Sequence, residues 1–99
     1  MGTRLQKRHL EDLQRRLGAA RESLGVLQEQ VAVWNEALDD ARIRSLVSET
    51  PMQTYDYHEL SRHVAAANAE LQRRANEVRR LMEERDELLR EWTPKDEDG

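Results

Sequence analysis

The sequence predicts an all-α fold, namely an antiparallel two-helix hairpin of the coiled-coil type. Three observations predict it. Apolar residues recur in steps of three and four in both halves of the chain, a short turn sequence separates the halves, and charged residues make up 36% of the composition. The 99 residues have room for one small domain. A hydrophobic share of 37% is typical of long, surface-rich helices rather than of a thick globular core.

The first helix is expected over residues 3–47. Its apolar residues form a seam with the 3.5-residue period of a coiled coil. The seam consists of Leu10, Leu13, Leu17, Ala20, Leu24, Leu27, Val31, Trp34, Leu38 and Ala41. Gly18 and Gly25 lie seven residues apart on the outer face of this helix. Each weakens the helix by about 1 kcal/mol relative to Ala, so they either permit the close approach of another helix or are tolerated within a long one.

The second helix is expected over residues 51–92, with a seam of the same period. That seam consists of Tyr57, Leu60, Val64, Ala67, Leu71, Arg74, Val78, Leu81, Arg85, Leu88 and Trp92. We expect the stems of the two arginines to pack in the seam while the guanidinium groups reach out to Glu or Asp. A polar seam residue can also fix the register of a helix pair.

A turn over residues 48–50 is expected to join the helices. Pro51 suits the first helical position, Thr50 suits the cap before it, and Gln53 completes a capping-box spacing. So short a turn makes the helices antiparallel neighbours. The predicted register pairs Leu10 with Leu88, Leu17 with Leu81, Leu27 with Leu71, Trp34 with Val64, and Leu38 with Leu60. A longer turn would shift each pair by three or four residues and would also place seam residues opposite seam residues. The capping residues favour the shorter turn and therefore the register given above.

The hairpin domain is predicted to cover residues 1–92, followed by a disordered acidic tail over 93–99. Basic residues predominate over 4–21 and acidic residues over 83–98, and an antiparallel hairpin lays these two segments side by side. Along a solvated pair of helices, this arrangement neutralises opposite charges.

Apolar residues beside each seam predict self-association. Ala19, Val26 and Val33 flank the first seam, and Ala75, Met82 and Leu89 flank the second. Because one buried stripe per helix leaves a two-helix pair marginally stable, we expect a homodimer that forms a four-helix bundle. The alternative is that these residues only widen the contact within one chain.

The stretch RSLVSETPMQTYDYHEL, residues 44–60, carries the strongest candidate site. In this stretch the seam positions become polar. Four apolar residues within it and Ile43 just before it take positions that point away from the seam if the heptad phase holds: Ile43, Leu46, Val47, Met52 and Tyr55. They would anchor a protein partner, with Glu49 and Asp56 as a polar rim. A local phase shift that turns some of them inward to close the end of the bundle is the alternative.

The sequence contains no arrangement typical of a catalytic or cofactor site, so we expect a non-enzymatic protein that needs no cofactor. Cysteine is absent, and His58, Glu59 and His63 do not complete a tetrahedral metal site. The net charge of −4 and the acidic residues among the arginine pairs disfavour nucleic-acid binding. The alternative function is that of a regulator that binds RNA polymerase, the ribosome or RNA through the arginine pairs and an acidic tip.

The segment DDARIRSLVSETP, residues 39–51, resembles one found in small, uncharacterised actinobacterial proteins that are mostly helical hairpins. The resemblance implies a bacterial source and brings no activity with it. No apolar run approaches the roughly 18 residues of a membrane span, and the N-terminus has no apolar signal core. We therefore expect a cytoplasmic protein without a membrane partner.

Overall fold

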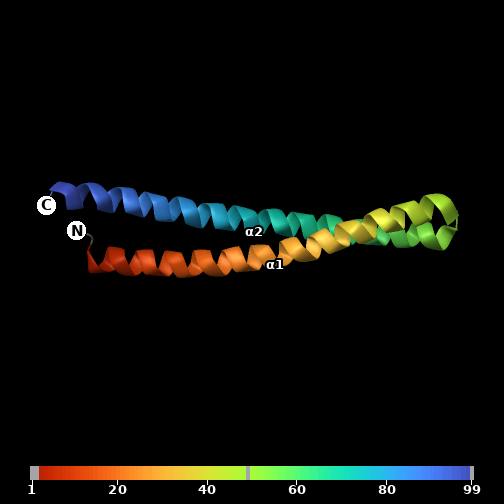
Figure 1. Cartoon of the computed structure of the whole chain (residues 1–99), viewed down its shortest axis with the longest axis horizontal. Helices are drawn as coiled ribbons and strands as arrows, with labels where there is room; N and C mark the ends of the chain where they lie inside the picture. The colour runs from red at the N-terminus through yellow and green to blue at the C-terminus, as the bar shows by residue number, and fades with distance from the viewer. Residues whose placement is uncertain (1–2, 49, 99) are drawn as a thin grey trace. The chain divides into compact units, whose positions relative to one another are not determined.

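The chain folds as an all-α helical hairpin, which confirms the predicted fold class. The computed structural model describes the backbone of residues 3–48 and 50–98, and side chains as far as Trp92. Two helices, α1 (Arg4–Ser48) and α2 (Pro51–Asp98), account for nearly all of these residues and run antiparallel to one another (Figure 1).

The helix bounds agree with the prediction except at the C-terminal end. The helix α1 begins and ends within one residue of the expected bounds, and α2 begins at Pro51 as expected. It then continues to Asp98, past the predicted end at residue 92. The disordered tail over 93–99 stays a prediction, because Gly99 and the side chains of 93–98 lie outside the described residues.

Side-chain caps explain where both helices begin. At α1, the Thr3 N–H donates to Gln6 Oε1 at 2.8 Å, and the Gln6 N–H donates to Thr3 Oγ1 at 3.0 Å. This is a complete capping box, which the sequence analysis did not single out. At α2, the Gln53 N–H donates to Thr50 Oγ1 at 3.4 Å, so Thr50 caps this helix as predicted. The other half of the capping box is not formed, because the Thr50 N–H donates to Ser48 Oγ at 3.5 Å and not to the Gln53 side chain.

The hairpin consists of two compact units. Unit 1 combines residues 1–24 with 74–99, and unit 2 is residues 25–73. The core of unit 1 is Leu13, Leu17, Val78, Leu81 and Leu88, with Leu10, Ala20, Leu24 and Met82 packed against it. Met82 belongs to the apolar flank of α2, so part of that flank widens the contact within the chain. This is the role that the alternative to dimerisation assigned to the flanking residues.

In unit 2, the seam buries Leu27, Val31, Ala41 and Val64. The whole predicted seam of both helices is buried or half-buried. By contrast, Val26 and Val33 on the flank of α1 are 52% and 63% exposed. The heptad period therefore identified the inward face of each helix correctly, and the apolar flank of α1 lies outside the core of its own chain.

Contacts between the helices follow the tighter register. In unit 2 the Trp34 and His63 rings meet edge to face, with centroids 4.7 Å apart, one residue from the predicted Trp34–Val64 pair. In unit 1 the Arg74 guanidinium crosses to α1 and donates to the Ser23 carbonyl at 3.1 Å. Arg74 thus reaches a backbone carbonyl of the opposite helix from its seam position.

Candidate interaction surface beside the turn

Hydroxyl groups close the end of the hairpin beside the turn. Ser45 Oγ of α1 lies 3.4 Å from Thr54 Oγ1 of α2, and Ser48 Oγ lies 3.3 Å from Thr50 Oγ1. The Thr54 hydroxyl also donates to the Thr50 carbonyl at 3.4 Å. Because polar groups pair with each other here, the interior of the turn end needs no large apolar side chain.

The five apolar residues of the candidate site are exposed to solvent. The fractions are 60% for Ile43, 71% for Leu46, 77% for Val47, 70% for Met52 and 62% for Tyr55. We call these five residues the tip patch. The heptad phase holds up to the turn, so these side chains keep the outward positions of their helices, and the inward phase shift considered as an alternative does not occur. That they bind a partner stays a prediction.

The polar rim predicted around the tip patch is described only in part. Asp56 is exposed on the first turns of α2, whereas Glu49 lies outside the described residues. Nearby on α1, Arg42 and Arg44 are also exposed. The surroundings of the tip patch therefore carry charges of both signs, an arrangement typical of the rim of a protein interface.

The histidines of unit 2 contact aromatic rings. His63 meets the edge of Trp34, and the His58 ring lies beside Tyr57 with centroids 5.5 Å apart. Among the described residues, no group of three or more His, Cys, Asp or Glu side chains is placed to hold a metal ion.

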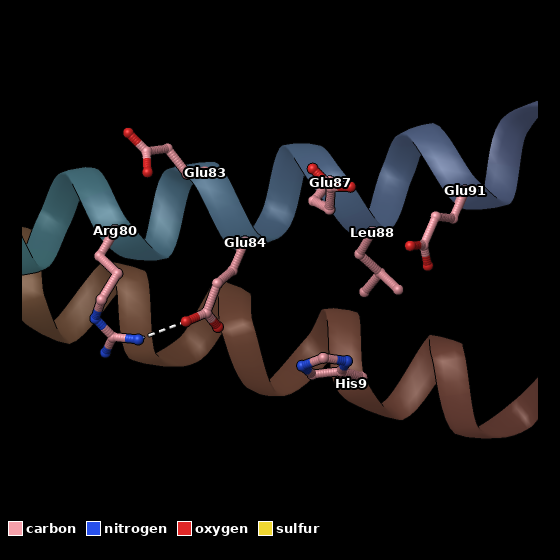
Figure 2. A pocket seen from close by; sticks show the side chains of 7 residues that line it. All are labelled: His9, Arg80, Glu83, Glu84, Glu87, Leu88 and Glu91. Atoms are coloured by element: carbon pink, nitrogen blue, oxygen red, sulfur yellow. Dashed lines mark hydrogen bonds and ion pairs between the residues drawn. The ribbon is translucent and has the colours of Figure 1, made fainter.

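Unit 1 contains an acidic groove that the sequence analysis did not predict. In Figure 2, His9 of α1 lies opposite Leu88 of α2, and the glutamate side chains of α2 stand on both sides of Leu88. The groove is open and has a volume of about 500 Å³, and its carboxylates are those of Glu83, Glu84, Glu87 and Glu91. The sequence contains a signal for this groove, because Glu84, Glu87 and Glu91 follow one another in steps of three and four residues on one side of α2.

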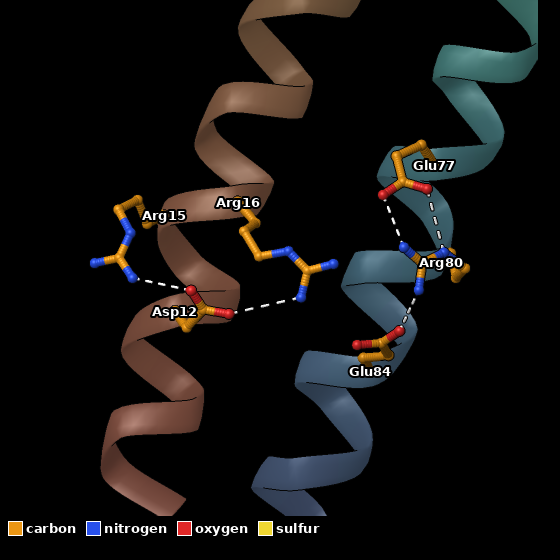
Figure 3. Close-up of polar contacts among 6 residues, drawn as sticks. All are labelled: Asp12, Arg15, Arg16, Glu77, Arg80 and Glu84. Atoms are coloured by element: carbon orange, nitrogen blue, oxygen red, sulfur yellow. Dashed lines mark hydrogen bonds and ion pairs between the residues drawn. The ribbon is translucent and has the colours of Figure 1, made fainter.

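Several arginines considered for phosphate binding are paired along their own helix. In unit 1, Asp12 accepts ion pairs from Arg15 at 2.9 Å and Arg16 at 3.6 Å (Figure 3). Arg80 pairs with Glu77 at 2.8 Å and also with Glu84. In unit 2, Arg73 pairs with Glu70 at 2.7 Å. These carboxylates offset the positive charge that a phosphate backbone needs.

The hydrogen bond from Arg80 lowers the pKa of Glu77 below its ordinary value, and the positive charges of Arg80 and Arg16 lower it further. Burial acts in the opposite direction and is outweighed. The same hydrogen bond raises the pKa of Arg80, so both groups are held in their charged forms.

No protein-family model, curated protein or solved structure matches this chain. Over the described residues, neither helix contains a stretch that is long and apolar enough to cross a membrane.

Proposed function

We propose that this chain is a non-enzymatic interaction module that binds another protein through the tip patch and also associates with itself. The observation that carries the first part is the exposure of five large apolar side chains beside one turn, each at least 60% exposed. The seam of the same helices buries comparable side chains such as Leu27 and Val31. Exposed large apolar side chains therefore gather most densely around the turn, whereas elsewhere they stand singly, as Leu5, Val26 and Val33 do.

Burial of the tip patch would provide enough free energy to hold a partner. Covering a Leu, Ile, Val or Met side chain stabilises a complex by about 1.5–3 kcal/mol relative to leaving it in water. Because hydroxyl groups already close the turn end, the tip patch has no role in the interior of its own chain. An apolar centre that contains Met and aromatic residues, surrounded by a polar rim, is typical of protein interfaces.

A double substitution in the tip patch tests this function. Leu46→Asp with Met52→Asp should abolish capture of the partner from a native bacterial lysate, because two carboxylates would have to be buried without counterions. Since both side chains are about 70% exposed, helicity by circular dichroism and mass by light scattering should stay those of the unsubstituted chain.

The matched control adds the same two charges elsewhere in unit 2. Gln28 and Asn35 are exposed on α1 outside the tip patch. The control variant carries Gln28→Asp and Asn35→Asp, and it should retain the partner. Equal capture by the tip-patch variant would refute the proposed contact surface. A loss of helicity in that variant would instead show that these side chains support the fold.

A further inference from the structure

Two glutamates on the outer face of α1 have no counterion. In unit 2, Glu29 and Glu36 are exposed, occupy the same heptad position, and make no ion pair among the described residues. No Lys or Arg stands three or four residues from either one, the spacing at which charges meet on a helix. In contrast, Glu70 and Glu77 of α2 each pair with an arginine three residues further on.

The same heptad position carries the opposite charge in the first part of α1. In unit 1, Arg8 and Arg15 are exposed and stand seven residues apart, as the two glutamates do. Arg8 makes no ion pair among the described residues, and Arg15 shares Asp12 with Arg16. Arg16 can keep Asp12 neutralised, so Arg15 can change partners at little cost.

We propose that α1 binds α1 of a second copy in antiparallel orientation, with Arg8 opposite Glu36 and Arg15 opposite Glu29 of the second copy. The two pairs have the same spacing, so one register satisfies both, and a twofold axis repeats them on the other half of the interface. A parallel arrangement in register would place each charge against the same charge. Charge complementarity therefore selects both the partner and its direction.

The small and apolar residues near the centre of this face fit the same register, whereas Val33 falls opposite Glu11. Val26, which is 52% exposed, falls opposite Gly18 of the second copy, and Gly25 falls opposite Ala19. A Cβ atom added at either glycine meets nothing within 4 Å in its own chain. The space above Gly18 can thus receive the valine of the second copy, and two helices can approach closely where their side chains are small.

Glu22 lies at the centre of this register and meets the Glu22 of the second copy. This one like-charge contact opposes the favourable pairs and limits the affinity. The substitution Glu22→Gln should therefore tighten self-association roughly twofold, since a single exposed charge contact changes binding by a small factor. Weaker self-association of Glu22→Gln would overturn the register.

This inference specifies the self-association included in the proposed function and does not depend on the tip patch. Two charge-reversed variants test it. The first carries Glu29→Arg and Glu36→Arg, and the second carries Arg8→Glu and Arg15→Glu. All four side chains are exposed, so circular dichroism should show unchanged helicity in both.

Sedimentation equilibrium should find the unsubstituted chain as a dimer and each variant alone bound to itself at least about tenfold more weakly, because each sets like charges against each other. A one-to-one mixture should form a heterodimer, since a basic row then faces an acidic row. Dimers of either variant as tight as those of the unsubstituted chain, or a mixture that stays monomeric, would overturn the inference.

The outcomes distinguish this inference from the tip-patch function. A monomeric unsubstituted chain would remove self-association and this inference together, and would leave partner capture by the tip patch intact. A normal dimer of the variant with Leu46→Asp and Met52→Asp supports the assignment of the two surfaces to different residues. Loss of the dimer in that variant would overturn the assignment to the outer face of α1.

Discussion

Single residues of α2 form ion pairs that are strong in geometry and weak in energy. Arg80 donates from Nη2 to Glu77 Oε1 at 2.8 Å and from Nε to Glu77 Oε2 at 3.2 Å, a two-point contact that favours the charged carboxylate. Both side chains are about half exposed, so water screens the attraction and the pair contributes little to folding. Its clearest effect is on proton binding by Glu77.

The pKa of Glu77 in the folded chain should lie below the ordinary value of 4.5. A lowered folded-state pKa means that the contribution to stability is present above 4.5 and is lost as the pH falls through the folded-state value. Titration of the Glu77 carboxyl carbon by NMR measures it directly. Arg80→Gln should raise the pKa, because it removes the first and largest cause, and identical titrations of both proteins would contradict the assignment.

Helix α1 contains glycines that its own chain does not require. Gly25 lies in the interior of a 45-residue helix, and an added Cβ atom would meet nothing within 4 Å. Gly25→Ala should stabilise the chain by about 0.5–1 kcal/mol, because alanine loses less backbone entropy in a helix. Urea unfolding at concentrations low enough to keep the chain monomeric measures this change without a contribution from self-association.

The reverse substitution on the same face provides the control. Ala32 is exposed one heptad beyond Gly25, and Ala32→Gly should destabilise the chain by about 1 kcal/mol. A destabilising effect of Gly25→Ala, paired with the expected effect at Ala32, would show that Gly25 has a packing role within its own chain.

At the scale of whole elements, the sequence predicted the seam and the turn because both depend on local rules. The period of 3.5 residues identified positions such as Leu17 and Val64 as buried, and the chemistry of Thr50 and Pro51 placed the start of α2. The capping box of Thr3 and Gln6 obeys an equally local rule and could have been predicted.

Two features could not be derived from periodicity. Apolar residues outside the seam near the turn are compatible with exposure or with a phase shift, and the exposed fractions of their side chains decide for exposure. The acidic groove beside His9 depends on how side chains of two helices face each other in space, which a single-helix pattern does not specify. The sequence thus named the candidate residues, and their exposure could be seen only in the structure.

For the molecule as a whole, a hairpin with one seam has limited means of stabilising itself. Every fully buried side chain of the described part is apolar, and the largest of them, Leu13, Leu17 and Leu81, lie in unit 1. In unit 2 the buried residues that the structure describes are one leucine, Leu27, and the smaller Val31, Ala41 and Val64. Because ordering each residue costs about 1.5 kcal/mol, additional burial against a second copy would add appreciably to a small net stability.

Thermal unfolding should therefore depend on protein concentration. Binding to a second copy stabilises the folded state by mass action, so the Tm of the unsubstituted chain should rise as the chain is concentrated. Raising the ionic strength to about 1 M shortens the screening length to roughly 3 Å and should reduce this rise, because charge pairs hold the proposed interface together.

The variant with Glu29→Arg and Glu36→Arg should show a Tm that changes much less with concentration, while the variant with Leu46→Asp and Met52→Asp should keep the dependence of the unsubstituted chain. Differential scanning calorimetry over a hundredfold range of concentration makes the comparison. A concentration dependence as large as that of the unsubstituted chain in the charge-reversed variant would place self-association on a face other than the outer face of α1. Because helix content should be the same in all three proteins, a difference in concentration dependence reports on the interface alone.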